Sequence, residues 1–156
     1  MKTVLSPGDR VPAFKTMTDD RGEISPTALK GKPFVIYFYP KDDTSGCTKE
    51  AIAFSDNKRK FDALGIQIIG VSKDGIPSHE KFRKKHKLKV SLGSDPEKQT
   101  AEAFGVWVEK SLYGRTYMGM DRATFLVDAE GVIRQVWRKV KVPGHAEAVL
   151  AAAKAL

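Results

Sequence analysis

The fold can be predicted outward from one stretch of the sequence, Phe34-Val35-Ile36-Tyr37-Phe38-Tyr39-Pro40-Lys41-Asp42-Asp43-Thr44-Ser45-Gly46-Cys47. Its first six residues are apolar on both faces of an extended chain, which predicts a central strand over 34–39 that is covered on both sides. A polar loop follows, and apolar residues then recur at helical spacing. This inward stripe comprises Cys47, Ala51, Phe54, Phe61 and Leu64, with Lys58 as one break and Gly65 as the helix C-cap. A buried strand thus delivers a partly exposed thiol to the first turn of a helix.

The same patterns predict the remaining elements outward from this stretch. Residues 66–72 form a second buried strand, and strands at 123–127 and 132–137 form a hairpin across the turn at 128–131. Near the N-terminus, strands at 11–14 and 22–25 form a hairpin around the turn at 18–21. Pro77 opens a helix, and a second helix is begun by the capping-box pair Ser94 and Glu97 and closed by Gly105. The other elements are a strand at 90–92, a loop with some strand character over 107–121, and a helix over 145–156.

This order of elements predicts the fold class. A β-α-β-α-β unit followed by an extra helix, a β-hairpin and a last helix gives a mixed sheet with helices on both faces. We expect a thioredoxin-like α/β fold with an N-terminal β-hairpin extension. The chain has no internal repeat, low-complexity tract or linker, so residues 1–156 are expected to form a single domain.

Composition limits the function classes. Hydrophobic residues make up 41% of the 156 residues, and the longest apolar run is six residues, so no membrane span or signal peptide is expected. A single cysteine excludes an internal disulfide framework and fits a reducing, cytoplasmic location. The net charge of +8 gathers at residues 58–60, 81–89 and 138–141, which we interpret as solvated faces that attract anions and not as a nucleic-acid site.

Four residues around Cys47 suit thiol chemistry. Unpaired N–H groups and the dipole at a helix N-terminus stabilise a thiolate, which is the nucleophilic form. Pro40 has no N–H and can shield a pocket wall, Thr44 is spaced to point its hydroxyl at the sulfur, and Gly46 allows close approach of a ligand to the next amides. Arg122 offers a positive charge that would favour the thiolate and stabilise an oxyanion.

Each of these residues also has an ordinary interpretation. A lone cysteine on an apolar stripe is usually a small buried hydrophobe, a threonine before a helix is usually a cap, and an arginine at a strand start is usually a surface charge. Their occurrence together favours a reactive site. His79, His86 and His145 match no metal-ligand spacing, so we expect solvated helix histidines and no metal.

The segment Tyr39-Pro40-Lys41-Asp42-Asp43-Thr44-Ser45-Gly46-Cys47-Thr48-Lys49-Glu50 closely resembles the Pro-x-x-x-Thr-x-x-Cys motif of peroxiredoxins, in particular the bacterioferritin-comigratory-protein, or Q-type, branch. The resemblance continues in order through residues 105–107, 117–119, 122–128 and 136–142. It implies a thioredoxin fold and reduction of hydrogen peroxide and organic hydroperoxides. The motif residues carry over as Pro40, Thr44, Cys47 and Arg122, with no metal, flavin or haem cofactor.

Two positions depart from that family. Ser45 stands where many relatives carry proline, and Ile52 stands where many carry a resolving cysteine. Other relatives place that cysteine in the next helix, about 77–87, where this chain has none. We therefore expect a one-cysteine enzyme, a monomer or weak dimer, whose Cys47 sulfenic acid is recycled by an external thiol such as thioredoxin, glutaredoxin or a low-molecular-weight thiol.

Other functions compete with this one. A disulfide oxidoreductase needs Cys-x-x-Cys, but Thr44 and Glu50 occupy both positions that a partner cysteine would take. A non-enzymatic peroxide sensor or chaperone could use the same thiol, and a nucleic-acid binder could use the basic faces. Rapid peroxide consumption with an added reductant separates the enzyme from the sensor, and a steeply salt-dependent DNA gel shift would identify the binder.

Overall fold

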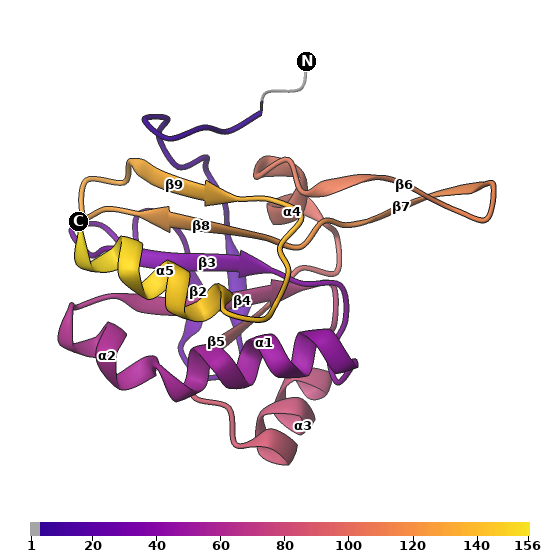
Figure 1. Ribbon diagram of the computed structural model, residues 1–156, viewed down its shortest axis with the longest axis horizontal. Helices are drawn as coiled ribbons and strands as arrows, with labels where there is room; N and C mark the ends of the chain where they lie inside the picture. The colour runs from indigo at the N-terminus through magenta and orange to yellow at the C-terminus, as the bar shows by residue number, and fades with distance from the viewer. Residues whose placement is uncertain (1–3) are drawn as a thin grey trace.

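The computed structural model describes residues 4–156, in which a seven-stranded mixed sheet has the strand order β2-β1-β5-β4-β3-β8-β9 (Figure 1). The strands are β1 (Thr16–Thr18), β2 (Gly22–Ile24), β3 (Phe34–Phe38), β4 (Gln67–Ser72), β5 (Ser91–Ser94), β8 (Ala123–Val127) and β9 (Ile133–Trp137). Strands β3, β4 and β5 are parallel, whereas β8 runs antiparallel to β3. The predicted central strand is confirmed.

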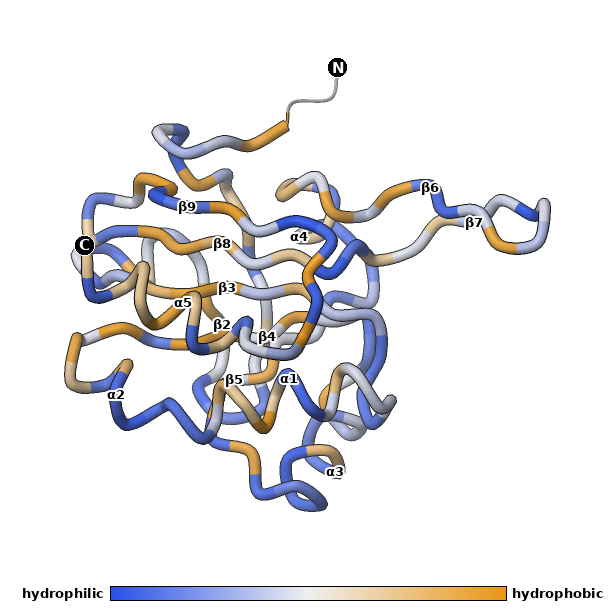
Figure 2. Tube along the Cα trace, viewed as in Figure 1, coloured by the Kyte–Doolittle hydropathy of each residue, from blue (hydrophilic) through white to orange (hydrophobic). Residues whose placement is uncertain are grey.

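Strand β3 lies at the middle of the sheet because it is apolar on both faces. Val35 and Tyr37 point into one core, and Phe34, Ile36 and Phe38 point into the other. In Figure 2, hydrophobic colour runs along much of β3 and β8, and hydrophilic colour covers much of α2 and α3. The alternation of strand side chains therefore divides one apolar run between two cores.

Helices cover both faces of this sheet, as the thioredoxin-like class predicts. The core that contains Val35 and Tyr37 packs against α1 (Ser45–Asp56), α2 (Lys58–Ala63), α3 (Ile76–His86) and α5 (His145–Lys154). The core that contains Phe34, Ile36 and Phe38 packs against α4 (Gln99–Ala103) and the N-terminal segment. Within residues 4–156, no helix is both long enough and apolar enough to cross a bilayer.

Three details of the sequence prediction were wrong. Residues 8–11 lie along the strand-turn region at 131–133, with Gly8 N–H donating to Ile133 O at 2.7 Å, so the first hairpin strand is 16–18 instead of 11–14. The Ser94 hydroxyl donates to Asp74 O instead of capping a helix, and the Asp95 carboxylate accepts the amides of the first turn of α4. Leu64 is 39% exposed and is not part of the inward stripe.

The segment expected to be a loop with strand character is a well-formed hairpin. Strands β6 (Trp107–Leu112) and β7 (Arg115–Met120) pair antiparallel and form a separate two-stranded sheet. The turn residues Tyr113 and Gly114 both have positive φ, as a two-residue hairpin turn requires. The hairpin projects from the body in Figure 1, and the chain leads from β7 directly to Arg122 and β8.

Candidate active site

The candidate site lies where three elements meet at one edge of the sheet. The C-terminal end of β3, the N-terminal end of α1 and the connection from β7 to β8 gather there (Figure 1). Cys47 is the third residue of α1, which begins at Ser45 and so starts two residues earlier than the sequence pattern indicated. The first amides of a helix have no acceptor within the helix, and α1 has no side-chain cap. The turn that carries Cys47 therefore has backbone amides that can bind an anion.

Cys47 itself is more deeply buried than expected. Its residue is only 2% exposed, and it packs in the core beside Ala51 and Phe54. The phenol ring of Tyr37 in β3 stacks on Phe54 with ring centroids 4.7 Å apart. This aromatic stack and the buried Cys47 side chain belong to the same core, between β3 and α1.

Arg122 is the cation that contacts the sulfur. Its Nη2 donates to Cys47 Sγ at 3.4 Å, and its Nη1 donates to Glu50 Oε1 at 2.6 Å. Gly46 makes this contact possible, because a Cβ at that position would lie 3.3 Å from Arg122 Nη2. A cation at this distance stabilises negative charge on sulfur or on an oxygen bound beside it.

Glu50 is a site residue that the sequence analysis missed. It is 1% exposed, and burial raises its pKa to about 7 although Arg122 acts to lower it. Its Oε2 is buried and has no hydrogen-bond partner. The signal in the sequence was its spacing: Glu50 lies three residues after Cys47, on the same inward face of the helix. A carboxylate on that face needs a cationic partner, and Arg122 supplies it.

Thr44 and Pro40 lie in the loop before α1. Thr44 is the N-cap residue, but its hydroxyl donates to Lys41 O at 2.9 Å and neither caps the helix nor forms a hydrogen bond with Cys47. Its hydroxyl oxygen retains lone pairs, and its side chain is exposed beside the first turn. Pro40 is half-buried immediately after β3. The structure thus brings Gly46, Cys47 and Arg122 into contact, while the Thr44 hydroxyl faces the loop backbone.

The prediction of solvated histidines was wrong for two of the three. His79 is 0% exposed and His145 is 6% exposed, because each ring is held by polar partners in a core. His145 Nε2 lies 2.8 Å from Thr124 Oγ1, and burial lowers its pKa to about 4. His86 pairs with Asp43 near the surface. Residues 4–156 contain no cluster of three His, Cys, Asp or Glu side chains that could hold a metal.

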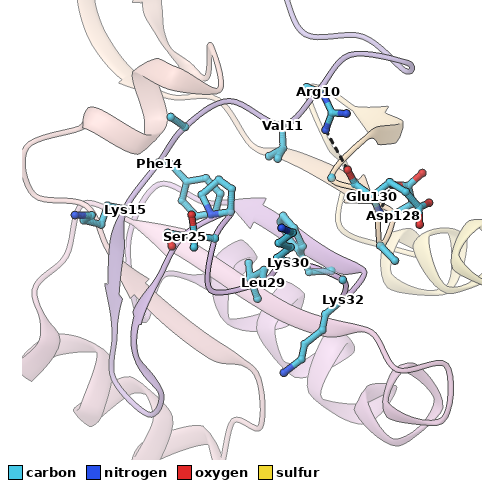
Figure 3. Close-up of a pocket in the computed structure, with 17 residues that line it drawn as sticks. Arg10, Val11, Phe14, Lys15, Ser25, Leu29, Lys30, Lys32, Asp128 and Glu130 are labelled. Carbon is cyan, nitrogen blue, oxygen red and sulfur yellow. Dashed lines mark hydrogen bonds between the residues drawn. The ribbon is translucent and has the colours of Figure 1, made fainter.

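A cavity of considerable size lies away from Cys47. It has a volume of about 890 Å³ and is lined by Phe34 at the start of β3 and by Asp128 after β8, at the opposite end of these strands. In Figure 3, Lys15 and Lys32 extend away from the other labelled side chains, so their charges do not converge on a ligand. The cavity contains neither Cys47 nor Arg122. This cavity and the candidate site at Cys47 are therefore separate places in the fold.

Comparison with known proteins identifies the family of this chain. Residues 7–136 match the AhpC/TSA family. The chain is 46% identical to peroxiredoxin Bcp of Bacillus subtilis over 138 residues, which cover 88% of each protein. Among solved structures, the peroxiredoxin Q C47S mutant of Xylella fastidiosa superimposes with a TM-score of 0.91 at 33% identity, covering 98% of each chain.

A third relative links this fold to peroxide chemistry. The bacterioferritin comigratory protein of Xanthomonas campestris, studied for its alkyl peroxide reduction activity, superimposes with a TM-score of 0.88 at 40% identity, covering 99% of this chain and 98% of that one. Variants of the same organism's peroxiredoxin Q replace one or the other of two cysteines by serine. The present chain has only Cys47.

Proposed function

Because this chain belongs to the AhpC/TSA family and is a thiol-dependent peroxidase, a peroxiredoxin of the Bcp or Q-type branch, we propose that its reaction takes place at Cys47. The observation that carries the proposal is the contact between Arg122 Nη2 and Cys47 Sγ at the start of α1. It places a fixed positive charge and free helix amides around the only thiol of the chain. The substrates are hydrogen peroxide and organic hydroperoxides.

The first step is a two-electron transfer to the peroxide. The Cys47 thiolate attacks the terminal peroxide oxygen, an S–O bond forms, and the O–O bond breaks. The departing hydroxide or alkoxide takes a proton and leaves as water or alcohol, and Cys47 becomes a sulfenic acid. Arg122 and the first amides of α1 stabilise the charge on the departing oxygen. Thr44 acts as a peroxide-positioning hydroxyl, and Pro40 as part of the wall that excludes water.

The second step requires a thiol from outside the chain. One external thiol attacks the sulfenic sulfur, releases water and leaves a mixed disulfide on Cys47. A second thiol then attacks this disulfide and returns Cys47 to its reduced state. Ile52 is half-buried against the core and supplies no sulfur. The reductant is thioredoxin, glutaredoxin or a low-molecular-weight thiol, and the reaction contributes to redox homeostasis in a reducing compartment such as the cytoplasm.

The experiment is a comparison of the natural protein with Cys47→Ser. Peroxide consumption is followed with each of the three kinds of reductant, and circular dichroism checks that the variant folds. We expect the variant to lose all peroxide reduction and to keep its fold, because a hydroxyl cannot replace a thiolate as nucleophile. Substantial turnover by Cys47→Ser would show that another group performs the reaction. Rapid oxidation of Cys47 with no reductant-driven turnover would identify a sensor instead.

A further inference from the structure

A buried polar network fastens the loop that leads to Cys47. The β3–α1 loop (residues 39–44) contains Asp42, which is only 6% exposed although it is charged. Its Oδ1 accepts the Tyr39 hydroxyl at 2.6 Å, and its Oδ2 accepts the Ser78 hydroxyl at 2.8 Å and lies 2.7 Å from His79 Nδ1. Its backbone N–H donates to Asp74 Oδ2 at 2.7 Å. The loop is therefore tied to β4 and α3.

His79 connects this loop to the sheet. Its Nε2 lies 2.8 Å from Gly93 O in β5, and a carbonyl oxygen can only accept, so Nε2 carries a proton. Its Nδ1 faces the Asp42 carboxylate, and imidazole is a stronger base than a carboxylate, so the proton between them belongs to His79. Both ring nitrogens are then protonated, and the buried ring is an imidazolium paired with Asp42.

We propose that His79 is a positioning residue, which through its buried ion pair with Asp42 holds the β3–α1 loop and so sets where Cys47 lies relative to Arg122. This inference rests on the proposed role of Cys47. Asp42 is two residues before Thr44, the N-cap of α1, so displacement of Asp42 displaces the first turn that carries the sulfur. Asp43 beside it has a φ of 59°, a strained conformation that persists only where the surroundings hold it.

The charges around His79 give this pair a pH dependence. Burial opposes a charge on the ring, but the Asp42 hydrogen bond and charge, the Gly93 carbonyl and the Asp74 carboxylate outweigh burial and raise the His79 pKa above its usual 6.5. The other groups at the pair, Tyr39 and Ser78, donate neutral hydroxyls to Asp42. When pH rises through the His79 pKa, one ring nitrogen faces an acceptor without a proton. The loop should then loosen.

The first test is NMR of the whole protein, which has only three histidines. Long-range ¹H–¹⁵N spectra at pH 7 distinguish an imidazolium from either neutral tautomer. We expect His79 to be doubly protonated and His145, whose pKa lies near 4, to be neutral. A neutral His79 at pH 7 would overturn the proposal, and this result needs no variant that folds.

The second test is the rate of Cys47 oxidation by peroxide as a function of pH. For the natural protein we expect the rate to fall at the pH where His79 loses its proton. His79→Gln should react at least about tenfold more slowly at pH 7 and lack this fall, since a small misplacement of reacting groups is costly. Asp42→Asn should shift that fall to lower pH, which loss of packing alone would not do.

A matched control is His86→Gln. His86 is on the same helix and pairs with Asp43 of the same loop at 2.9 Å, but its side chain is 22% exposed and that of Asp43 is 43% exposed, so water screens this pair more than the buried one. We expect its rate and pH profile to match the natural protein. If His79→Gln and the natural protein have equal pH profiles and Cys47→Ser is inactive, the positioning role of His79 is wrong and the proposed function stands. If Cys47→Ser is active, the proposed function is wrong, and the protonation of His79 seen by NMR is unaffected.

Discussion

At the residue scale, the Arg122 side chain contacts two partners with two different nitrogens. Nη2 donates to Cys47 Sγ and Nη1 donates to Glu50 Oε1, so the planar fork holds the sulfur and the carboxylate in one arrangement. A lysine ammonium has the same charge but cannot reach both groups with the same geometry. We therefore expect the site to require the guanidinium shape and not the charge alone.

Arg122→Lys should lower the second-order rate of peroxide reduction by about 10²-fold, the usual cost of losing one donor to a developing oxyanion. Stopped-flow kinetics of Cys47 oxidation measure this rate. The control is Lys85→Ala, which removes an exposed lysine paired with Asp43 at the surface. Similar losses in the two variants would indicate a diffuse electrostatic effect instead of a contact at the site.

Glu50 makes stability depend on pH. Its pKa of about 7 in the folded protein exceeds its ordinary value of 4.5, because burial penalises the carboxylate. The folded state thus binds this proton more tightly, and the resulting stability is complete below pH 4.5 and is lost as pH rises through 7. The difference in pKa corresponds to about 3 kcal/mol.

Glu50→Gln removes this titration and keeps the shape of the side chain. We expect the natural protein to lose up to about 3 kcal/mol more than the variant between pH 4.5 and pH 8. Urea unfolding of both proteins at the two pH values measures the difference. If both proteins lose the same free energy, Glu50 is ionised throughout and its pair with Arg122 outweighs burial.

At the element scale, α1 packs on β3 through the Tyr37–Phe54 stack. A glycine in β4 leaves room for the Tyr37 ring. Gly70 is the partner of Tyr37 in the β3–β4 register. A Cβ on Gly70 would lie 2.6 Å from the Tyr37 ring, which a packed core cannot accept without movement. We therefore expect Gly70 to determine, through the Tyr37 ring, how closely α1 and its Cys47 pack on the sheet.

Gly70→Ala should destabilise the protein by about 1–3 kcal/mol and slow peroxide reduction, because the displaced Tyr37 ring pushes on Phe54 and α1. Chemical denaturation and the peroxidase assay measure the two effects. The matched control is Gly75→Ala, where the new Cβ would meet only Pro77 Cδ at an ordinary 3.7 Å and φ is −81°. A stable and fully active Gly70→Ala would show that the stack does not position α1.

The sequence predicts elements with strong periodicity better than it predicts their ends. The run at 34–39 identified the central strand, and the stripe beginning at Cys47 identified α1, because burial on a fixed face leaves a regular pattern. The first hairpin was displaced because Thr18 closes its own turn by accepting from Arg21 N–H and donating to Gly22 O. Such local side-chain bonds leave no periodic signal.

The candidate site was predictable in part. Gly46 and Cys47 share one segment, and Arg122 was predicted from its charge at the start of a strand and from its resemblance to a family motif. Glu50 and His79 were missed or misplaced, because their roles depend on partners 72 and 37 residues away in the chain. The burial of a polar side chain can be predicted only when the partner that it contacts in the fold is known.

At the scale of the whole molecule, a single buried cysteine determines the fate of the oxidised enzyme. Cys47 is 2% exposed, so two molecules cannot bring their sulfurs together without rearrangement. The remaining routes are a mixed disulfide with an external thiol or further oxidation. Without reductant, excess peroxide should therefore inactivate the protein by forming sulfinic acid, and Cys47-linked dimers should be minor on non-reducing gels.

Mass spectrometry of Cys47 after one equivalent of peroxide tests directly whether peroxide converts this thiol to a sulfenic acid. The intact protein is mixed with peroxide, then divided into samples with and without dimedone. We predict the gain of one oxygen atom on Cys47 in the sample without dimedone and a stable dimedone adduct in the sample with it. An external thiol added before dimedone should remove the oxygen and prevent the adduct. Peroxide consumption that leaves Cys47 unmodified, or rapid and near-complete dimerisation through Cys47, would contradict the account.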